Sequence, residues 1–269
     1  MRALGAFQAL SLVGLLAVGI EAAASAPPPG EIEAGGEAAA ILRGRRVYVA
    51  EGCIHCHSQY VRPNTRDEAD WGPSHPLDRT ENPPLVGARR QGPDLLEVGN
   101  RRNALWHELH LRDPRSLHPG SRMPSYAHLF SGDGQRGRDL VAYLASLGES
   151  DGMERWQLTA RRRGDPPPAP PSAARGAALF ATYCAVCHGA QGRGDGRYAE
   201  RIGDPYLNLR KSGFHSVPPE VPEEQALARI VRYGLPPTSM PGHEWLGDQQ
   251  VADLVAYVRT LPAPKETAR

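Results

Sequence analysis

Residues 53–57 read Cys-Ile-His-Cys-His, and residues 184–188 read Cys-Ala-Val-Cys-His. Both fit the pattern C-x-x-C-H, in which two thiols bond to the vinyl groups of one haem and the histidine ligates the iron. The chain has four cysteines, and the two motifs contain all of them. The sequence therefore predicts two covalently bound haem c groups. The residues expected to attach them and to bind their irons are Cys53, Cys56, Cys184 and Cys187, with His57 and His188.

Zinc ribbons and thioredoxin-like redox sites also contain C-x-x-C, so a single copy would leave the cofactor open. A four-cysteine zinc site normally has its two halves about 15–20 residues apart. Here the two pairs lie in different halves of the chain, and a histidine directly follows each pair. Both features favour haem over zinc.

The length and charge restrict the class of protein. A chain of 269 residues favours one or two domains, and two haem motifs favour two. The 31 basic and 30 acidic residues give a net charge of +1. This balance gives no indication of a nucleic-acid partner.

The N-terminus has the features of an export signal. One arginine precedes an apolar run from Ala3 to Ile20, and small residues with A-x-A spacing follow. This arrangement predicts a signal peptide over residues 1–26, cleaved near Ala24 or Ala26. A retained anchor is the alternative, since about 18 apolar residues can span a bilayer. Both readings predict a periplasmic protein, either free or tethered to the inner membrane.

An internal repeat divides the chain. Asp139–Tyr143 and Asp253–Tyr257 both read DLVAY, and the order Gly, aromatic residue, first motif cysteine occurs at 44–53 and again at 176–184. We therefore expect an all-α protein with two tandem cytochrome c-like haem domains. The expected domains are residues 37–148 and 173–263.

Residues 149–172 are predicted to be a linker, because their prolines favour an extended polyproline conformation. Apolar periodicity predicts helices within the two domains. The predicted helices are 37–50, 103–111, 138–147, 173–182 and 248–261. The remaining segments, including the one between the second motif and Met240, are expected to be loops.

Two methionines are candidates for the sixth iron ligand. Met123 and Met240 are each followed by proline, and each lies between its haem motif and the DLVAY sequence. A thioether ligand favours Fe(II) and raises the reduction potential. With both axial positions filled, each iron would transfer electrons rather than activate oxygen or peroxide. Methionine as a core residue is the alternative.

Other side chains could compete for the same position. His118 and His128 flank Met123, and His243 follows Met240. We expect these and the remaining histidines to be surface or hydrogen-bonding residues. The tryptophans expected to pack around the haem edges are Trp71, Trp106 and Trp245.

The first domain resembles the mono-haem cytochrome c subunit of cbb-type haem-copper oxidases. The similar stretches are GRRVYVAEGCIHCHSQYVRP (44–63), QGPDL (91–95) and WHELHLRDPRSLHPGSRMPSY (106–126). The resemblance implies that Met123 is an axial ligand and that electrons pass to an oxidase. It also implies that Arg62 and the backbone around Pro93 lie near the haem.

The second domain is similar to class I cytochromes c. The stretches LFATYCAVCHGAQGRGDG (179–196) and TSMPGHEWLGDQQVADLVAYVRTL (238–261) carry this likeness. The chain also departs from the oxidase subunits, which have one haem and a transmembrane anchor. It has a second haem domain and an insert at 64–88.

Residues and resemblances together predict a periplasmic di-haem c-type cytochrome that is not itself an enzyme. It would relay electrons from an upstream donor to a membrane terminal reductase, of the haem-copper oxidase or nitric oxide reductase type. A di-haem peroxidase is one alternative, but it needs an iron with an open sixth position. A subunit with a mainly structural role in assembling a respiratory complex is the other.

Overall fold

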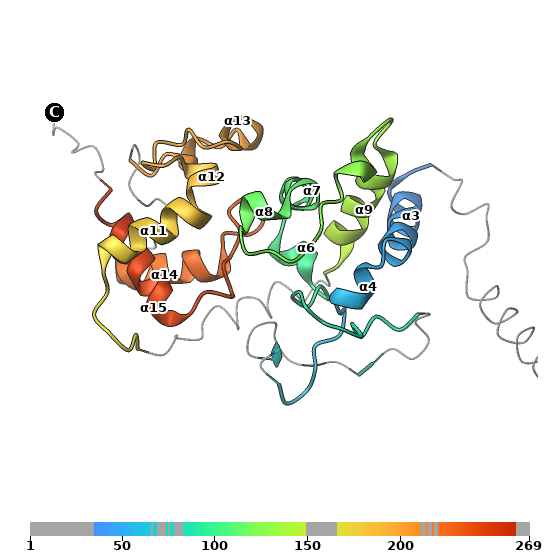
Figure 1. Cartoon of the computed structure of the whole chain (residues 1–269), viewed down its shortest axis with the longest axis horizontal. Coiled ribbons are helices and arrows are strands. Elements are labelled where there is room, and N and C mark those ends of the chain that lie inside the picture. The colour runs from blue at the N-terminus through green and yellow to red at the C-terminus, as the bar shows by residue number, and fades with distance from the viewer. Residues whose placement is uncertain are drawn as a thin grey trace, which may run out of the picture.

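In the computed structural model, the described residues are 35–65, 67–68, 74, 76–77, 83–148, 166–210, 214, 217 and 220–261. The predicted signal or anchor, most of the predicted linker and much of the 64–88 insert lie outside these residues. In the described ranges, every regular element is a helix, and none is long and apolar enough to cross a membrane. Figure 1 shows two helical domains next to each other.

The first domain begins and ends with its two longest helices. Its elements are α3 (Glu37–Ala50), α4 (Cys53–Cys56), α6 (Val98–Arg101), α7 (Ala104–Arg112), α8 (Pro114–Leu117), η1 (Ala127–Phe130) and α9 (Gln135–Ser146). The predicted helix at 37–50 is therefore confirmed, and the helix at the end of the domain begins three residues earlier than expected.

The second domain repeats this plan. Its elements are α11 (Ala173–Tyr183), α12 (Ala185–His188), α13 (Ala199–Ile202), η2 (Pro205–Leu207), α14 (Glu223–Tyr233) and α15 (Asp248–Val258). The prediction that only loops precede Met240 was wrong, since α14 lies there. Its apolar residues recur at helical spacing, but the prolines that flank it on the N-terminal side pointed to a loop.

The first and last helices of each domain cross at a glycine. A Cβ atom on Gly44 of α3 would lie 2.0 Å from the carbonyl oxygen of Asp139 in α9. A Cβ atom on Gly176 of α11 would lie 1.9 Å from the carbonyl oxygen of Asp253 in α15. Only glycine permits two backbones to approach this closely, which explains why the glycine recurs in the repeat.

An ion pair of the same form lies beside each crossing. Arg43 donates to both carboxylate oxygens of Asp139, at 2.8 and 3.0 Å. Arg175 donates to both oxygens of Asp253, at 2.7 and 2.8 Å. Both aspartate side chains are only 4% exposed, and each is the first residue of a DLVAY sequence. The repeated DLVAY sequence therefore contributes residues to the contact surface of each helix crossing.

Each domain has its own hydrophobic core next to the crossing. Tyr48 and Tyr143 pack in the first core, with ring centroids 5.5 Å apart. Phe180 and Tyr257 take the corresponding places in the second domain, at 5.2 Å and at the same 58° angle between the rings. The crossing and its core hold the end of the first helix, where the haem motif begins.

Candidate haem sites

Each C-x-x-C-H motif begins where the first helix of its domain ends. In the first domain, Gly52 adopts a left-handed turn (φ 74°) between α3 and the short helix α4, which carries Cys53 and Cys56. In the second domain, Cys184 directly joins α11 to the short helix α12. The rigid helix crossing thus determines where both pairs of thiols lie.

The histidine of each motif forms the same hydrogen bond. Nδ1 of His57 lies 2.9 Å from the carbonyl oxygen of Pro93, and Nδ1 of His188 lies 2.8 Å from that of Leu207. Because a carbonyl only accepts, Nδ1 carries the proton in both rings and Nε2 keeps its lone pair. This is the tautomer in which Nε2 can bind a metal ion.

Burial keeps these groups neutral. It lowers the pKa of both His57 and His188, more than the hydrogen bonds to the backbone carbonyls raise it. Burial also raises the pKa of the Cys53 thiol to about 11 and that of the Cys184 thiol to about 12. A neutral imidazole is the form that ligates iron.

The QGPDL stretch forms the wall behind His57. A Cβ atom on Gly92 would lie 2.3 Å from Cε1 of His57, so the ring packs directly on the backbone there. Asp94 is buried and accepts hydrogen bonds from Ser58 Oγ at 2.5 Å and from the backbone nitrogen of Tyr60 at 2.9 Å. Asp94, for which no role was predicted from the sequence, thus fixes the loop whose carbonyl orients His57.

Arg62 does not line the cavity that contains His57. It donates instead to the carbonyl oxygens of Val86 and Gly87, at 3.1 and 3.0 Å. Gly87 packs closely against the backbone of His57. Arg62 thus supports the histidine through a neighbouring loop, whereas Pro93 contacts it directly.

One continuous cavity of about 840 Å³ contains all eight sequence-predicted site residues. It is lined by the two cysteines and the histidine of each motif, and by both Met123 and Met240. None of the four cysteines forms a disulfide bond, and two lie in each domain. Within the described ranges, no three His, Cys, Asp or Glu side chains cluster to hold a metal ion.

These residues fit two haem c groups. Each domain offers two thiols for covalent attachment, an imidazole with its Nε2 lone pair available, and a thioether from a separate loop. The donor set is the one that haem c uses in His/Met electron-transfer sites. A zinc ion would need four ligands around one point, and the arrangement of the cysteines does not provide that.

The histidines that could rival the methionines lie in different environments. His128 is exposed and lies 3.2 Å from a carboxylate oxygen of Glu51. His118 lines the cavity and stacks on Tyr183 of the second domain, with ring centroids 5.7 Å apart. His243 is buried, and its Nδ1 lies 3.2 Å from the carbonyl oxygen of Val231.

Two further histidines are more buried than their predicted surface or hydrogen-bonding role implies. His107 and His110 of α7 line the cavity, and burial lowers the pKa of each to about 3. Nε2 of His107 and Nδ1 of His110 have no hydrogen-bond partner among the described residues. Their spacing of three places them on one helix face beside Trp106, a signal that helical periodicity could have revealed. His75, His215 and Trp71 lie outside the described residues.

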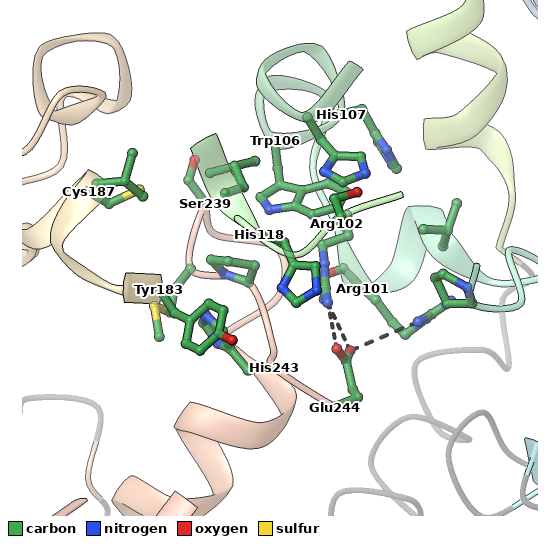
Figure 2. Close-up of a pocket in the computed structure, with 18 of the residues that line it drawn as sticks. Arg101, Arg102, Trp106, His107, His118, Tyr183, Cys187, Ser239, His243 and Glu244 are labelled. Carbon is green, nitrogen blue, oxygen red and sulfur yellow. Dashed lines mark hydrogen bonds and ion pairs between the residues drawn. The ribbon is translucent and has the colours of Figure 1, made fainter. Parts of the chain in front are cut away.

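The two domains meet through a buried ion pair. Nη2 of Arg102 donates to Oε2 of Glu244 at 2.7 Å, to its Oε1 at 3.0 Å, and to the carbonyl oxygen of Gly242 at 2.8 Å. Arg101 adds a longer contact to the same carboxylate, at 3.9 Å (Figure 2). Burial would raise the pKa of Glu244, but Arg102 and Arg101 lower it below its ordinary value. The carboxylate is therefore ionised at neutral pH.

Aromatic rings and a partly buried pair of hydroxyl groups extend this interface. His118 of the first domain lies between Tyr183 and Trp245 of the second, with centroid distances of 5.7 and 5.0 Å. Ser116 Oγ lies 2.7 Å from the hydroxyl oxygen of Tyr198. The sequence predicted a linker between independent domains, but it did not reveal that the domains contact each other.

The comparisons with known proteins match both domains. Residues 37–137 match the family model described as cytochrome c oxidase, mono-haem subunit/FixO. Residues 173–262 match the family model for cytochrome c. The chain carries two tandem cytochrome c-like domains. No curated protein matched the chain.

The resemblances stated from the sequence are therefore confirmed for both domains, as is the all-α fold with two cytochrome c-like units. Both matches support a c-type cytochrome that acts in electron transfer. The two cytochrome c-like domains have the same donor types in the same order: two thiols, an imidazole, and then a methionine followed by proline.

Proposed function

We propose that this protein is a periplasmic di-haem c-type cytochrome that relays electrons in a respiratory chain to a membrane terminal reductase. Haem c supplies one-electron redox chemistry when bound. Cys53, Cys56 and His57 would hold one haem with Met123, and Cys184, Cys187 and His188 would hold the other with Met240. The observation that carries the proposal is the repeated Nδ1 hydrogen bond, which leaves one Nε2 in each domain available to iron.

The first domain supports the identity of the acceptor. Its match to the mono-haem oxidase subunit favours a haem-copper oxidase of the cbb type, or a related nitric oxide reductase, as the partner. The second domain would receive electrons from an upstream donor, as its match to a general electron carrier suggests. The signal-like N-terminus supports the proposal of export, with the chain either free in the periplasm or tethered to the inner membrane.

Substituting the two methionines tests this function. Met123→His and Met240→His should each lower the potential of their own haem by on the order of 100 mV, because imidazole stabilises Fe(III) better than a thioether. The oxidised wild type should show the weak far-red charge-transfer band of Fe–S ligation. Each variant should lose the part of this band that comes from its own haem. A wild type without this band, or with rapid peroxide turnover, would favour the peroxidase alternative.

The N-terminus of the mature protein tests export. We expect N-terminal sequencing of the periplasmic protein to begin between Ser25 and Gly36, as cleavage after the A-x-A pattern requires. An intact N-terminus recovered only in membrane fractions would instead indicate a retained anchor. Co-purification with a membrane reductase whose turnover does not reduce these haems would favour the assembly role.

A further inference from the structure

The loop that carries Met240 is held from two sides. Its own domain contributes backbone bonds: the nitrogen of Leu235 donates to the carbonyl oxygen of Met240 at 3.1 Å, and the nitrogen of Met240 donates to Thr238 Oγ1 at 3.1 Å. His243 closes the loop, with its nitrogen donating to the carbonyl oxygen of Val231 at 3.0 Å. These bonds define the turn, and the first domain supplies the rest.

Two consecutive residues of the first domain contact this loop on either side of Met240. Nδ2 of Asn103 donates to Ser239 Oγ at 2.9 Å, and Nη2 of Arg102 donates to the carbonyl oxygen of Gly242 at 2.8 Å. Ser239 and Gly242 are the residues that flank Met240-Pro241. Hydrogen bonds from the first domain therefore hold the residues on both sides of the Met-Pro pair.

Arg102 and Asn103 are themselves held in place by other contacts. Asn103 caps α7, because its Oδ1 accepts from the backbone nitrogen of Trp106 at 2.9 Å. The guanidinium of Arg102 lies over the Trp106 ring, 5.0 Å from its centroid. The buried Glu244 carboxylate binds the same guanidinium. A helix end, an aromatic ring and a buried acid thus hold the donors in place.

We propose that Arg102 and Asn103 are positioning residues for Met240, so that the docked first domain forms part of the second haem site. The inference rests on the proposed function, in which Met240 is an axial ligand. A thioether binds iron weakly, so its occupancy depends on how far the loop is preorganised. Loss of the hydrogen bonds from Arg102 and Asn103 would return conformational freedom to the loop. It would therefore favour dissociation of Met240 from the iron.

The buried charges of Arg102 and Glu244 restrict the two domains to one relative position. Arg102 and Glu244 are each about 6% exposed, and each has the other as its counter-ion across the interface. A displaced docking would leave both charges buried without partners, which is strongly unfavourable. Trp245, the residue after Glu244, packs on His118 at 5.0 Å, so the aromatic contact depends on the same relative position.

Competition by free imidazole tests the inference in the full-length holoprotein. Met123→His serves as the background, because the first site then has two imidazole ligands and the far-red band reports Met240 alone. In this background, Arg102→Ala should increase the affinity of the second site for added imidazole about tenfold or more, equivalent to about 1.4 kcal/mol. Asn103→Ala should also increase this affinity for imidazole, and Arg102→Lys should increase it less than Arg102→Ala does.

The matched control is Arg197→Ala. It removes an exposed ion pair across the same interface, in which Arg197 lies 3.3 Å from Asp113, and it should leave imidazole affinity unchanged. If Arg102→Ala behaves like this control while the band is present, the inference is overturned and the proposed function stands. If the band is absent without these substitutions, the proposed function itself fails. Should Arg102→Ala not fold, Glu244→Gln is judged by the same two outcomes.

Discussion

The side of the first domain that contacts the second includes residues of α6, α7 and α8, and it carries the buried side chains of Arg101, Arg102 and His107. The facing wall of the second domain is the Met240 loop with Trp245, and the buried acid in it is Glu244. Away from this interface the domains are nearly equivalent, with the same helix crossing, ion pair and aromatic pair. The repeated features build each domain, and the features that differ join the two.

This division follows from what each contact needs. A helix crossing lies within one domain, so each copy of the repeat carries all of its parts. The interface needs a base in one copy and an acid in the other, so the two copies must differ there. Removing one partner of a buried ion pair costs about 3–5 kcal/mol when the other stays buried. The asymmetry is therefore energetically significant, although it occupies few residues.

The largest effects should come from the two crossing glycines. Gly44→Val and Gly176→Val should each destabilise their own domain by about 3 kcal/mol or more, because the new side chain would collide with a backbone carbonyl. Denaturant unfolding followed by helical circular dichroism and haem absorbance would measure this. Ala178→Val, at an exposed position of α11, should change stability by less than about 0.5 kcal/mol. Equal effects at positions 176 and 178 would contradict the crossing geometry.

Separation of the two domains should have a smaller effect on the stability of the second domain than the glycine substitutions do. Residues 172–269, exported together with haem-maturation machinery, should yield a folded mono-haem protein, because the core around Phe180 and Leu254 draws on this domain alone. Haem content per chain and helical circular dichroism would test this. Good expression without haem incorporation would show instead that the second domain needs the first in order to fold. The isolated domain should also bind imidazole more readily than the full chain does.

The sequence was informative wherever a feature is local or repeated. The haem motifs, the helix at 37–50 and the Met-Pro pairs all lie on the cavity or lead into it, because their order along the chain reflects short-range geometry. The helix α14 was missed, since the prolines before it outweighed its apolar spacing. The Arg102–Glu244 pair could not be predicted: its partners are 142 residues apart, and neither belongs to the repeat. A single charged residue does not indicate its partner.

The smallest of the expected effects concerns the ion pair beside the second crossing. The Arg175 guanidinium holds the pKa of Asp253 below its ordinary value, assisted by the backbone nitrogen of Ser172. A lowered folded-state pKa stabilises the protein at pH values above the unfolded pKa of about 3.9. This stabilisation is lost as the pH falls through the folded pKa. Asp253→Asn should therefore cost about 1 kcal/mol at pH 7, a modest value because Arg175 is half exposed.

The cost of Asp253→Asn should vanish in acid, since wild type and variant then both carry an uncharged side chain. Unfolding curves at pH 7, 5 and 3 would measure the difference between the two proteins directly. Thr182→Ala, at an exposed position of α11, should give a difference from wild type that does not vary with pH. If the difference for Asp253→Asn were the same at all three pH values, the stabilisation at this crossing would come from packing around the side chain. Its charge would then contribute nothing, and the resemblance between the two crossings would be one of shape alone.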